Sequence, residues 1–459
     1  MSYCRKTFFV TIACCAIIAV FVRPAYSQAP PEKKPAPIKA PAGDAEKLSA
    51  SAKLIKDYFK AKTPEERGRI IEELEKIGFM PPAKDLSRII KEAAVYPDMA
   101  PLKRTTRKIK VNGEEYTYEL SPPKGYSPKK EEPLIISLHG SGGDGMNALH
   151  LWRIHPDDQD AAKDKIIDSI ILSGQTPPPK NSMRVTPIVK TEQYIIAAPT
   201  LEKVPQGGAP TDLLEHLLPA LLQDVTSTCN VDTNRIFIVG FSMGGHFTWA
   251  ETLHQPDYFA GAIPMMGACD DMNTLSNLQS LPVYIIHGDK DTIVPVECSR
   301  SANEALTALK YDVIYREQKG LGHYLFSDKS PECAKLLAWI KSKTRNPYIK
   351  KISYRFSGQS APVKRIYWLE VSQKELNPFT VEAEVADNTI NIKSAGLAEM
   401  TVLLNSEIVD FAKDVIIRVN GNEVFKGKSS PSYKFLLENY QEYKDPNSLF
   451  TAGVKLKIR

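Results

Sequence analysis

The sequence predicts an α/β fold, in which helices cover a mostly parallel β-sheet, followed by a module of antiparallel strands. Two observations lead to this prediction: apolar segments alternate with helical segments through the middle of the 459-residue chain, and polar and apolar residues alternate strictly near its end. Apolar strands separated by helices are buried on both faces of a parallel sheet, whereas alternating strands bury one face only. The two parts of the chain therefore differ in architecture.

The parallel sheet is expected within residues 101–345. This region opens with two alternating runs joined by Asn112-Gly113, a dipeptide typical of a β-hairpin. The predicted buried strands are Pro133–Leu138, Tyr194–Ala198, Arg235–Val239, Gly261–Met266, Pro282–Ile286 and Asp312–Arg316. Helical stretches such as 212–224 and 301–309 separate them. Ligands of such sheets bind beyond the carboxyl ends of the strands, so we expect the functional site there.

The segments around these strands have other patterns. Residues 44–100 carry helical periodicity, with a helix start at Thr63, and predict a short helical segment. Residues 346–459 alternate and contain a second hairpin signal at Asn420-Gly421, which predicts an antiparallel β-sandwich domain. The Pro-rich stretch 149–190 is too long for a plain connection, so we expect a cap or substrate loop there.

Residues 1–27 are typical of a secretory signal. Arg5 and Lys6 precede an apolar run, and Ala25-Tyr26-Ser27 supplies the small residues of a cleavage site. Residues 28–43, rich in Pro, Ala and Lys, are expected to form a disordered linker. We expect a secreted or periplasmic protein without a membrane span after processing. The alternative is an uncleaved membrane anchor.

Charge and cysteine content exclude several classes of function. Loss of the signal removes three positive charges from a formal net charge of +5, so no nucleic-acid partner is expected. Cleavage leaves Cys229, Cys269, Cys298 and Cys333. An even number permits disulfides in an oxidising compartment, and four buried thiols are the alternative. Their spacing fits no zinc site, and no metal or organic cofactor is required.

Ser242 is the candidate nucleophile. It lies in Gly240-Phe241-Ser242-Met243-Gly244, directly after a predicted strand and before a predicted helix. A strand-to-helix turn of this kind exposes the serine hydroxyl, and the small residues at 240 and 244 leave room for the strained backbone. The amino end of the helix favours negative charge beside the serine.

Two later strands end in the residues that activate such a serine. Asp291 follows one strand in a HGDKDTIVP segment, and His323 follows the next strand in GLGH. We predict His323 as the general base and Asp291 as the acid that orients it. Asp291 is preferred to Asp289 because the loop needs several residues to bring a carboxylate beneath the imidazole. The resulting order Ser, Asp, His fits an α/β enzyme with this serine turn.

Acyl transfer also needs donors for a developing oxyanion. The HGSGG segment, residues 139–143, follows the first buried strand and can direct backbone N–H groups into the site. We predict the N–H groups of Ser141 and Met243 as the oxyanion hole, with Gly140 as the substitute for Ser141. The alternative for HGSGG is a tight turn without a catalytic role.

These segments resemble the α/β-hydrolase superfamily, and more narrowly its secreted esterases, which include feruloyl esterases, acetylxylan esterases and polyhydroxybutyrate depolymerase-like enzymes. The resemblance covers about 134–340 and rests on HGSGG, NVDTNRIFIVGFSMGG, AGAIPMMG, IIHGDKDTIVP and GLGH. It implies an α/β-hydrolase fold and a Ser242, Asp291, His323 triad. The stretch 149–190 and the β-domain depart from the minimal single-domain esterases.

The leading functional hypothesis is a carboxylic-ester hydrolase that forms an acyl-enzyme and acts on esters of carbohydrates or polymers. A serine peptidase of the prolyl-oligopeptidase type is the first alternative, although those enzymes carry a large domain before the hydrolase domain. A non-catalytic protein that binds a polysaccharide or another partner is the second. Tyr354, Tyr367 and Trp368 could stack on sugars, but aromatic residues in alternating strands are more often core.

Overall fold

The computed structural model describes residues 42–153, 189–201, 211–324, 330–358, 362–372 and 377–458. The predicted signal, residues 28–41 of the predicted linker and most of the predicted cap at 149–190 lie outside these residues. The last two residues of the predicted linker, 42–43, are instead the start of a helix. None of the described helices is long and apolar enough to cross a membrane. Residues Glu46–Arg459 form one compact unit.

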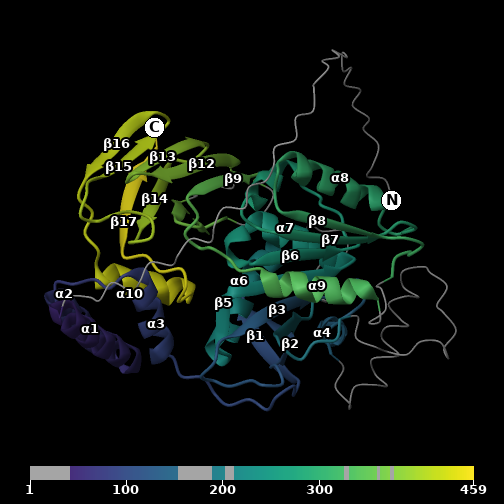
Figure 1. The fold of residues 1–459 in the computed structure, drawn as a ribbon, viewed down its shortest axis with the longest axis horizontal. Coiled ribbons are helices and arrows are strands. Elements are labelled where there is room, and N and C mark those ends of the chain that lie inside the picture. Colours follow the sequence, from purple (N-terminus) through teal and green to yellow (C-terminus); the bar gives the residue numbers. More distant parts are fainter. Residues whose placement is uncertain are drawn as a thin grey trace, which may run out of the picture. The chain divides into compact units, whose positions relative to one another are not determined.

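An eight-stranded sheet in the order β1-β2-β4-β3-β5-β6-β7-β8 forms the centre of the fold (Figure 1). Its strands are β1 (Thr105–Val111), β2 (Glu114–Ser121), β3 (Glu132–Leu138), β4 (Ile195–Pro199), β5 (Val231–Phe241), β6 (Gly261–Met265), β7 (Val283–Gly288) and β8 (Val313–Gln318). The β1–β2 hairpin and its junction with β4 are antiparallel, and the pairs from β4 to β8 are parallel. This confirms the predicted mostly parallel sheet.

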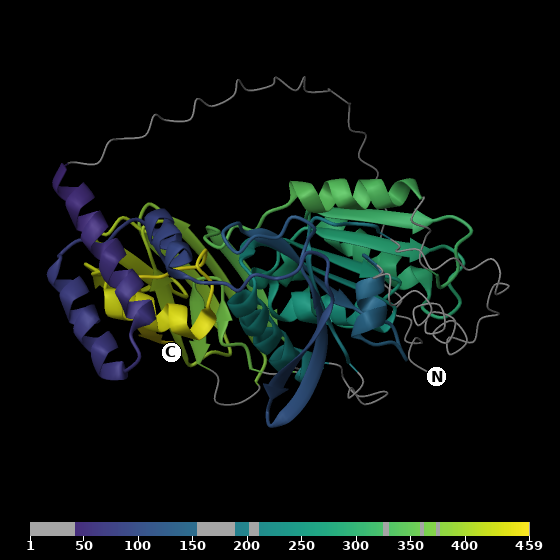
Figure 2. The same cartoon turned by 90° about the horizontal axis from the view of Figure 1, so that it is seen from below.

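Helices cover both faces of this sheet. They are α4 (Gly145–His150), α6 (Thr211–Thr228), α7 (Met243–His254), α8 (Val296–Ala308) and α9 (Pro331–Ser342), with short 3-10 helices η2 (Pro256–Tyr258) and η3 (Met272–Leu278). Ile136 of β3 packs in one core with residues of α6, α7 and α8, whereas its neighbour Ile135 packs with α4 and α9. Adjacent strand residues point to opposite faces, so the continuous apolar runs satisfy two cores. In Figure 2, α9 lies across the sheet from α6.

The C-terminal module contains two further sheets, in the orders β10-β11-β14-β17 and β16-β15-β13-β12-β9. Its elements are β9 (Lys351–Phe356), β10 (Arg365–Ile366), β11 (Leu369–Ser372), β12 (Phe379–Ala386), β13 (Thr389–Ala395), β14 (Glu399–Leu404), β15 (Val415–Val419), β16 (Asn422–Gly427), α10 (Tyr433–Tyr443) and β17 (Ala452–Lys457). One shared core of buried side chains joins the two sheets. The predicted sandwich is present, with one departure: β13 and β15 pair in parallel, because the chain crosses to β14 in the other sheet between them.

The aromatic side chains considered for sugar stacking belong to this core. Tyr354, Tyr367 and Trp368 are 3%, 6% and 0% exposed. The core interpretation of these three residues is therefore correct. They are not available to a polysaccharide on the module surface.

The N-terminal helices α1 (Ala42–Lys60), α2 (Pro64–Lys76) and α3 (Ala83–Ala93) form where helical periodicity predicts them. Thr63 caps α2 in a capping box with Glu66. Buried residues of all three helices pack in one cluster with residues of α10, so the two ends of the described chain share a core (Figures 1 and 2).

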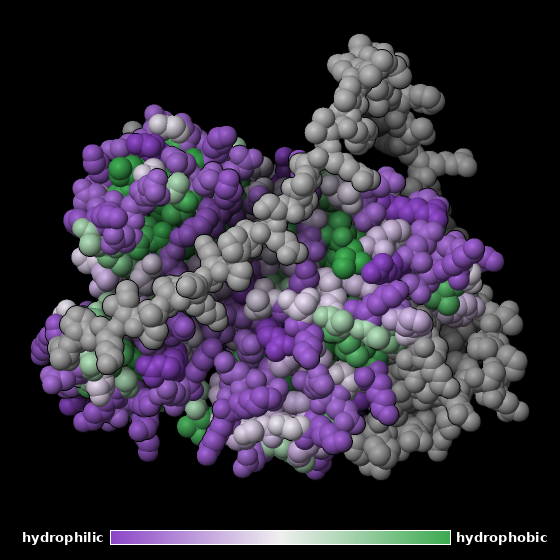
Figure 3. Space-filling model, viewed as in Figure 1, coloured by the Kyte–Doolittle hydropathy of each residue, from purple (hydrophilic) through white to green (hydrophobic). Residues whose placement is uncertain are grey.

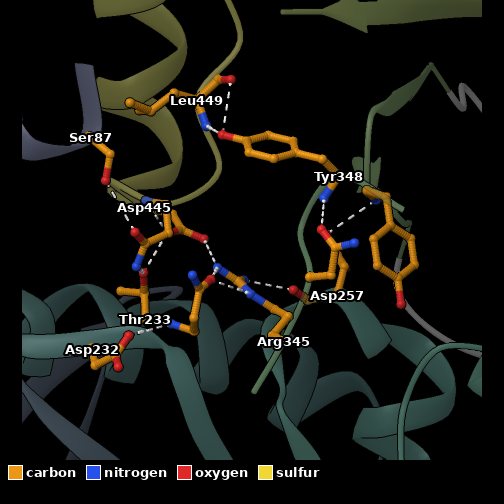
Figure 4. A network of polar contacts seen from close by, with 12 residues as sticks. Ser87, Asp232, Thr233, Asp257, Arg345, Tyr348, Asp445 and Leu449 are labelled. Atoms are coloured by element: carbon orange, nitrogen blue, oxygen red, sulfur yellow. Dashed lines mark hydrogen bonds and ion pairs between the residues drawn. The ribbon is translucent and has the colours of Figure 1, made fainter. Parts of the chain in front are cut away.

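Buried polar contacts join the C-terminal module to the central sheet (Figure 4). Arg345 donates through Nη2 to Asp445 Oδ2 at 2.7 Å and through Nη1 to the carbonyl oxygen of Asp257 at 2.7 Å. Asp445 Oδ1 accepts from the Thr233 hydroxyl of β5 at 2.6 Å. Burial opposes ionisation of Asp445, but Arg345 and Thr233 together lower the pKa of its carboxyl group.

A second set of contacts lies near the amino end of the sheet, where α7 ends and η3 leads into β7. The Tyr354 hydroxyl of β9 donates to the carbonyl oxygen of His254 at the end of α7, at 2.8 Å. Asn277 of η3 accepts from the Arg355 N–H at 2.8 Å and donates to the Arg355 carbonyl oxygen at 2.9 Å. The module therefore contacts both α7 and the segment that follows β6.

The face of the molecule in Figure 3 is mostly hydrophilic, with small and separate apolar patches. Among the described residues, Val95, Leu309, Ile293, Val424 and Met272 are the large apolar side chains with substantial exposure. No disulfide joins Cys229, Cys269, Cys298 and Cys333.

Candidate active site

Ser242 stands at a strained turn between β5 and α7. Its φ is 56° and its ψ is −117°, which is an unfavourable conformation for a residue with a side chain. The N–H of Ser242 donates to the carbonyl oxygen of Met265 at 2.9 Å, which fixes the turn against β6. The turn thus holds the serine hydroxyl above the carboxyl end of the sheet.

Glycines make this turn possible. A Cβ at Gly240 would lie 2.0 Å from the carbonyl oxygen of Gly244, and one at Gly244 would lie 2.4 Å from that of Leu138. The sequence predicted these two positions. It did not reveal Gly267, where a Cβ would lie 2.4 Å from the carbonyl carbon of Gly245, so the loop after β6 also packs directly on α7.

Three side chains predicted from the sequence form one hydrogen-bonded line. His323 Nε2 lies 2.8 Å from Ser242 Oγ, and His323 Nδ1 lies 2.7 Å from Asp291 Oδ2. The side chains of His323 and Asp291 are 2% and 0% exposed. The Phe241 ring lies 5.0 Å from the His323 ring and covers it on one side. The hydroxyl is thus connected to a buried carboxylate through one imidazole.

The loops that carry Asp291 and His323 are fastened to each other. The N–H of Lys290 donates to the Leu321 carbonyl oxygen at 2.9 Å. The Asp289 carboxylate accepts from the N–H of Gly320 at 2.6 Å. Asp289 therefore braces the loop of His323, and Asp291 is the carboxylate that contacts the imidazole.

The environment of Asp291 favours the carboxylate form. Burial alone would raise its pKa, but hydrogen bonds from His287, His323 and the Val294 N–H lower it far below its usual range. Asp291 is thus an anion at any pH at which the imidazole can accept a proton. A permanent anion at this position stabilises the imidazolium that forms when His323 takes a proton from the serine.

The HGSGG segment lies beside Ser242. A Cβ at Gly140 would be 3.5 Å from the Ser242 Cβ. The Leu201 N–H donates to His139 Nε2 at 2.9 Å, so the ring hydrogen is on Nδ1, which donates to the Gly140 carbonyl oxygen at 2.7 Å. In a trans peptide the next N–H points the opposite way. His139 therefore fixes the direction of the Ser141 N–H.

The second predicted donor, the N–H of Met243, is the first of α7. The first N–H groups of a helix have no partner within the helix, and they point out of its amino end. Ser141 is exposed, and Gly140 and Met243 are partly buried. The N–H groups of Ser141 and Met243 remain the predicted oxyanion donors.

Two other histidines near the strand ends do not contact Ser242 in the described hydrogen bonds. His246 Nδ1 lies 3.1 Å from Asp270 Oδ2, outside the hydrogen-bonded line. His287 contacts Asp291 itself, at 3.2 Å. Among the described residues, no group of three or more His, Cys, Asp or Glu side chains is placed to hold a metal ion.

Comparison with known proteins supports the fold. The profile of the phospholipase/carboxylesterase family matches residues 126–338. The protein NocK of Nocardia uniformis subsp. tsuyamanensis, assigned as an esterase, is 25% identical over 195 residues, which are 42% of this chain and 50% of NocK. Acyl-protein thioesterase 1 of Gibberella zeae is 29% identical over 96 residues, 19% of this chain and 41% of that protein. The chain thus spans half or less of the length of these relatives.

Solved structures with a similar arrangement include a thermostable esterase, with a TM-score of 0.40 and 23% identity over 53% of this chain and 63% of that one. The ferulic acid esterase of Anaeromyces mucronatus has a TM-score of 0.37 and 19% identity, and the match covers 52% of this chain and 89% of the esterase.

Proposed function

We propose that this chain, a member of the α/β-hydrolase superfamily of esterases, hydrolyses carboxylic esters through an acyl-enzyme on Ser242. The observation that carries the proposal is the line from Asp291 through His323 to Ser242, with hydrogen bonds of 2.7 and 2.8 Å. A hydroxyl at an exposed turn becomes a nucleophile when an oriented imidazole can accept its proton.

In the first half-reaction, Ser242 Oγ attacks the ester carbonyl carbon while its proton moves to His323 Nε2. Asp291 holds Nδ1–H and stabilises the imidazolium. The N–H groups of Ser141 and Met243 donate to the oxyanion of the tetrahedral intermediate. When the intermediate collapses, the bond to the alkoxy oxygen breaks, and the departing alcohol takes the proton from Nε2.

In the second half-reaction, water gives a proton to His323 Nε2 and attacks the acyl carbon bound to Ser242. The new intermediate expels the serine oxygen, which recovers the proton from Nε2. The acid leaves, and the enzyme returns to its starting protonation state. Both halves use the same base and the same oxyanion donors, so one geometry serves the whole cycle.

We further propose that the chain is exported and that its substrates are esters of carbohydrates or polymers. The support for export is the charged start, apolar run and small-residue site within residues 1–27. Tyr354, Tyr367 and Trp368 of the C-terminal module are buried in its core, so recognition of a large substrate must use other surfaces.

The test combines labelling and turnover. Purified protein should react with a fluorophosphonate at Ser242 and hydrolyse short p-nitrophenyl esters. Methyl ferulate, acetylated xylan and a proline-containing peptide anilide then separate the acyl classes and the peptidase alternative. Ser242→Ala should lose both labelling and turnover while its thermal unfolding stays close to wild type. If the protein hydrolyses the anilide in preference to every ester, the esterase proposal is wrong and the protein is a peptidase.

A further inference from the structure

A second buried histidine contacts the carboxylate that orients His323. His287 Nε2 lies 3.2 Å from Asp291 Oδ2 and 2.9 Å from the Val294 carbonyl oxygen, and its side chain is 0% exposed. Both neighbours of Nε2 are acceptors, so Nε2 carries a hydrogen. The other ring nitrogen, Nδ1, lies 2.7 Å from the Ser299 hydroxyl of α8.

We propose that His287 and Ser299 are positioning residues, which hold Asp291 in the orientation that lets His323 accept a proton from the serine. This proposal rests on the proposed function. It assigns no bond-making step to either residue. They act only through the direction and hydrogen bonding of the carboxylate.

The contacts of Asp291 show what His287 adds. Asp291 Oδ1 accepts from the N–H groups of Ile293 and Val294, each at 2.9 Å. Those two bonds hold one oxygen to its own loop. Oδ2 accepts from His323 at 2.7 Å and lies 3.2 Å from His287, which approaches it from β7. Without His287, the oxygen that serves His323 would have the imidazole as its one described side-chain partner, and the carboxylate could rotate out of line.

Ser299 sets the hydrogen on His287. The Ser299 residue is 1% exposed, so its hydroxyl needs an internal partner, and it can donate to Nδ1 when the ring hydrogen is on Nε2. That ring form directs its hydrogen toward the Val294 carbonyl oxygen at 2.9 Å and Asp291 Oδ2 at 3.2 Å. The opposite ring form would place a lone pair against the carboxylate, which is unfavourable.

The charged groups near His287 are otherwise paired. Glu317 of β8 is its register partner, but the Glu317 carboxylate accepts from Arg300 at 2.7 and 2.9 Å and from the Tyr315 hydroxyl at 2.7 Å. Asp291 is therefore the carboxylate that His287 contacts directly among the described residues. The inference does not depend on a change of charge on His287.

The experiment compares four variants by kcat, KM and the rate of fluorophosphonate labelling. His287→Leu removes both ring contacts, and His287→Gln keeps an amide N–H that can reach Asp291. Ser299→Ala removes the hydroxyl alone. Ser301→Ala is the matched control, because Ser301 is exposed on the same helix. Small displacements of catalytic groups cost up to about 100-fold, so His287→Leu should lower kcat by about 10- to 100-fold with little change in KM.

The other three variants should change kcat less than His287→Leu does. His287→Gln should recover most of the lost kcat, Ser299→Ala should lose several-fold, and Ser301→Ala should match wild type. Labelling rates should fall in the same proportion as kcat, because both need the activated serine. The downfield NMR signal of the His323 Nδ1 proton should move in His287→Leu and return toward its original position in His287→Gln.

The outcomes separate this inference from the proposed function. Wild type that neither labels nor hydrolyses esters overturns the proposed function. An active wild type together with a folded His287→Leu of unchanged kcat and unchanged NMR signal overturns the positioning role alone. If His287→Leu does not fold, Ser299→Ala decides: normal kcat and an unmoved signal in that variant refute the inference.

Discussion

Removal of the Arg345 guanidinium tests how far the C-terminal module stabilises the catalytic sheet. Arg345 and Asp445 form an ion pair whose side chains are 4% and 7% exposed. Arg345→Met keeps side-chain volume but leaves the Asp445 carboxylate buried without its cation, and it removes the donor to the Asp257 carbonyl oxygen. Breaking a buried pair in this way costs about 3–5 kcal/mol.

That cost translates into a measurable change in melting temperature. Unfolding entropy is about 2.1 cal/mol/K per residue, and for a cooperative unit of about 400 residues a loss of 3–5 kcal/mol lowers Tm by about 4–6 °C. Calorimetry or circular dichroism measures this shift. Lys343→Met is the matched control, because Lys343 lies two residues from Arg345 in the chain and pairs with the half-exposed Asp312. Loss of this pair should lower the free energy of unfolding by less than about 1 kcal/mol.

Activity should separate from stability in this variant. Asn234, which also contacts Arg345, lies at the start of β5, and at about 3.3 Å per residue it is roughly 25 Å along the strand from Ser242. We therefore expect kcat at 25 °C to stay within about two-fold of wild type. The double variant Arg345→Met/Asp445→Asn should regain part of the lost Tm, because the unpaired charge is gone. An Arg345→Met protein with unchanged Tm, or a double variant with fully additive losses, would refute the buried-pair interpretation.

Three further predictions follow from the same contacts. A chain that ends at residue 345 should be recovered as insoluble or molten protein, because it exposes the surfaces that β9 and the 445–449 segment cover; a soluble monomer with a cooperative melt would contradict this. Asp291→Asn should lower kcat by about 10⁴-fold, as loss of the orienting acid does in serine proteases. Asp289→Asn should lower kcat much less. If the two effects are reversed, Asp289 is the orienting acid. The pKa of Asp445 is lower in the folded protein than in the unfolded chain. Its contribution to the free energy of unfolding is therefore present above pH about 4 and is lost as the pH falls further, so Tm should decrease less steeply in acid in Asp445→Asn than in wild type.

Local patterns predicted most of the fold because they reflect burial of single elements. The alternating runs around Asn112-Gly113 and Asn420-Gly421 form hairpins, and the apolar runs of the middle region form β3 to β8. The helix α10 was missed among alternating strands. Its signal was present: Ser432 caps it, and Tyr433, Leu436, Leu437 and Tyr440 repeat at helical spacing.

The pairing of elements that are far apart in the chain could not be predicted from the sequence. The parallel β13–β15 pair depends on the crossover through β14, and a strand pattern carries no information about its neighbour. The same holds for the cluster that joins α1–α3 to α10, since their residues are separated by almost the whole described chain.

In the candidate site, the chain order of Ser242, Asp291 and His323 could be predicted because each follows a strand of one parallel sheet. Their actual alignment depends on contacts that leave no local pattern. Asp289 was a competing acid by sequence, and only the structure shows its carboxylate bound to the Gly320 N–H. The sequence places His287 directly after the predicted strand Pro282–Ile286, but its contact with Asp291 depends on the loop conformation.

The C-terminal module contacts elements that carry the site, and it does so at the amino end of the sheet. Thr233 at the start of β5 binds Asp445, and β5 ends in the turn that holds Ser242. Near the same end, η3 packs on β9, and η3 follows the loop whose Gly267 lies against α7. Because the serine turn is strained, it needs surroundings that hold its neighbours rigidly. Since Tyr354, Tyr367 and Trp368 are core, we attribute to the module the support of β5, α7 and η3, the elements that hold this turn, rather than contact of these residues with sugar rings.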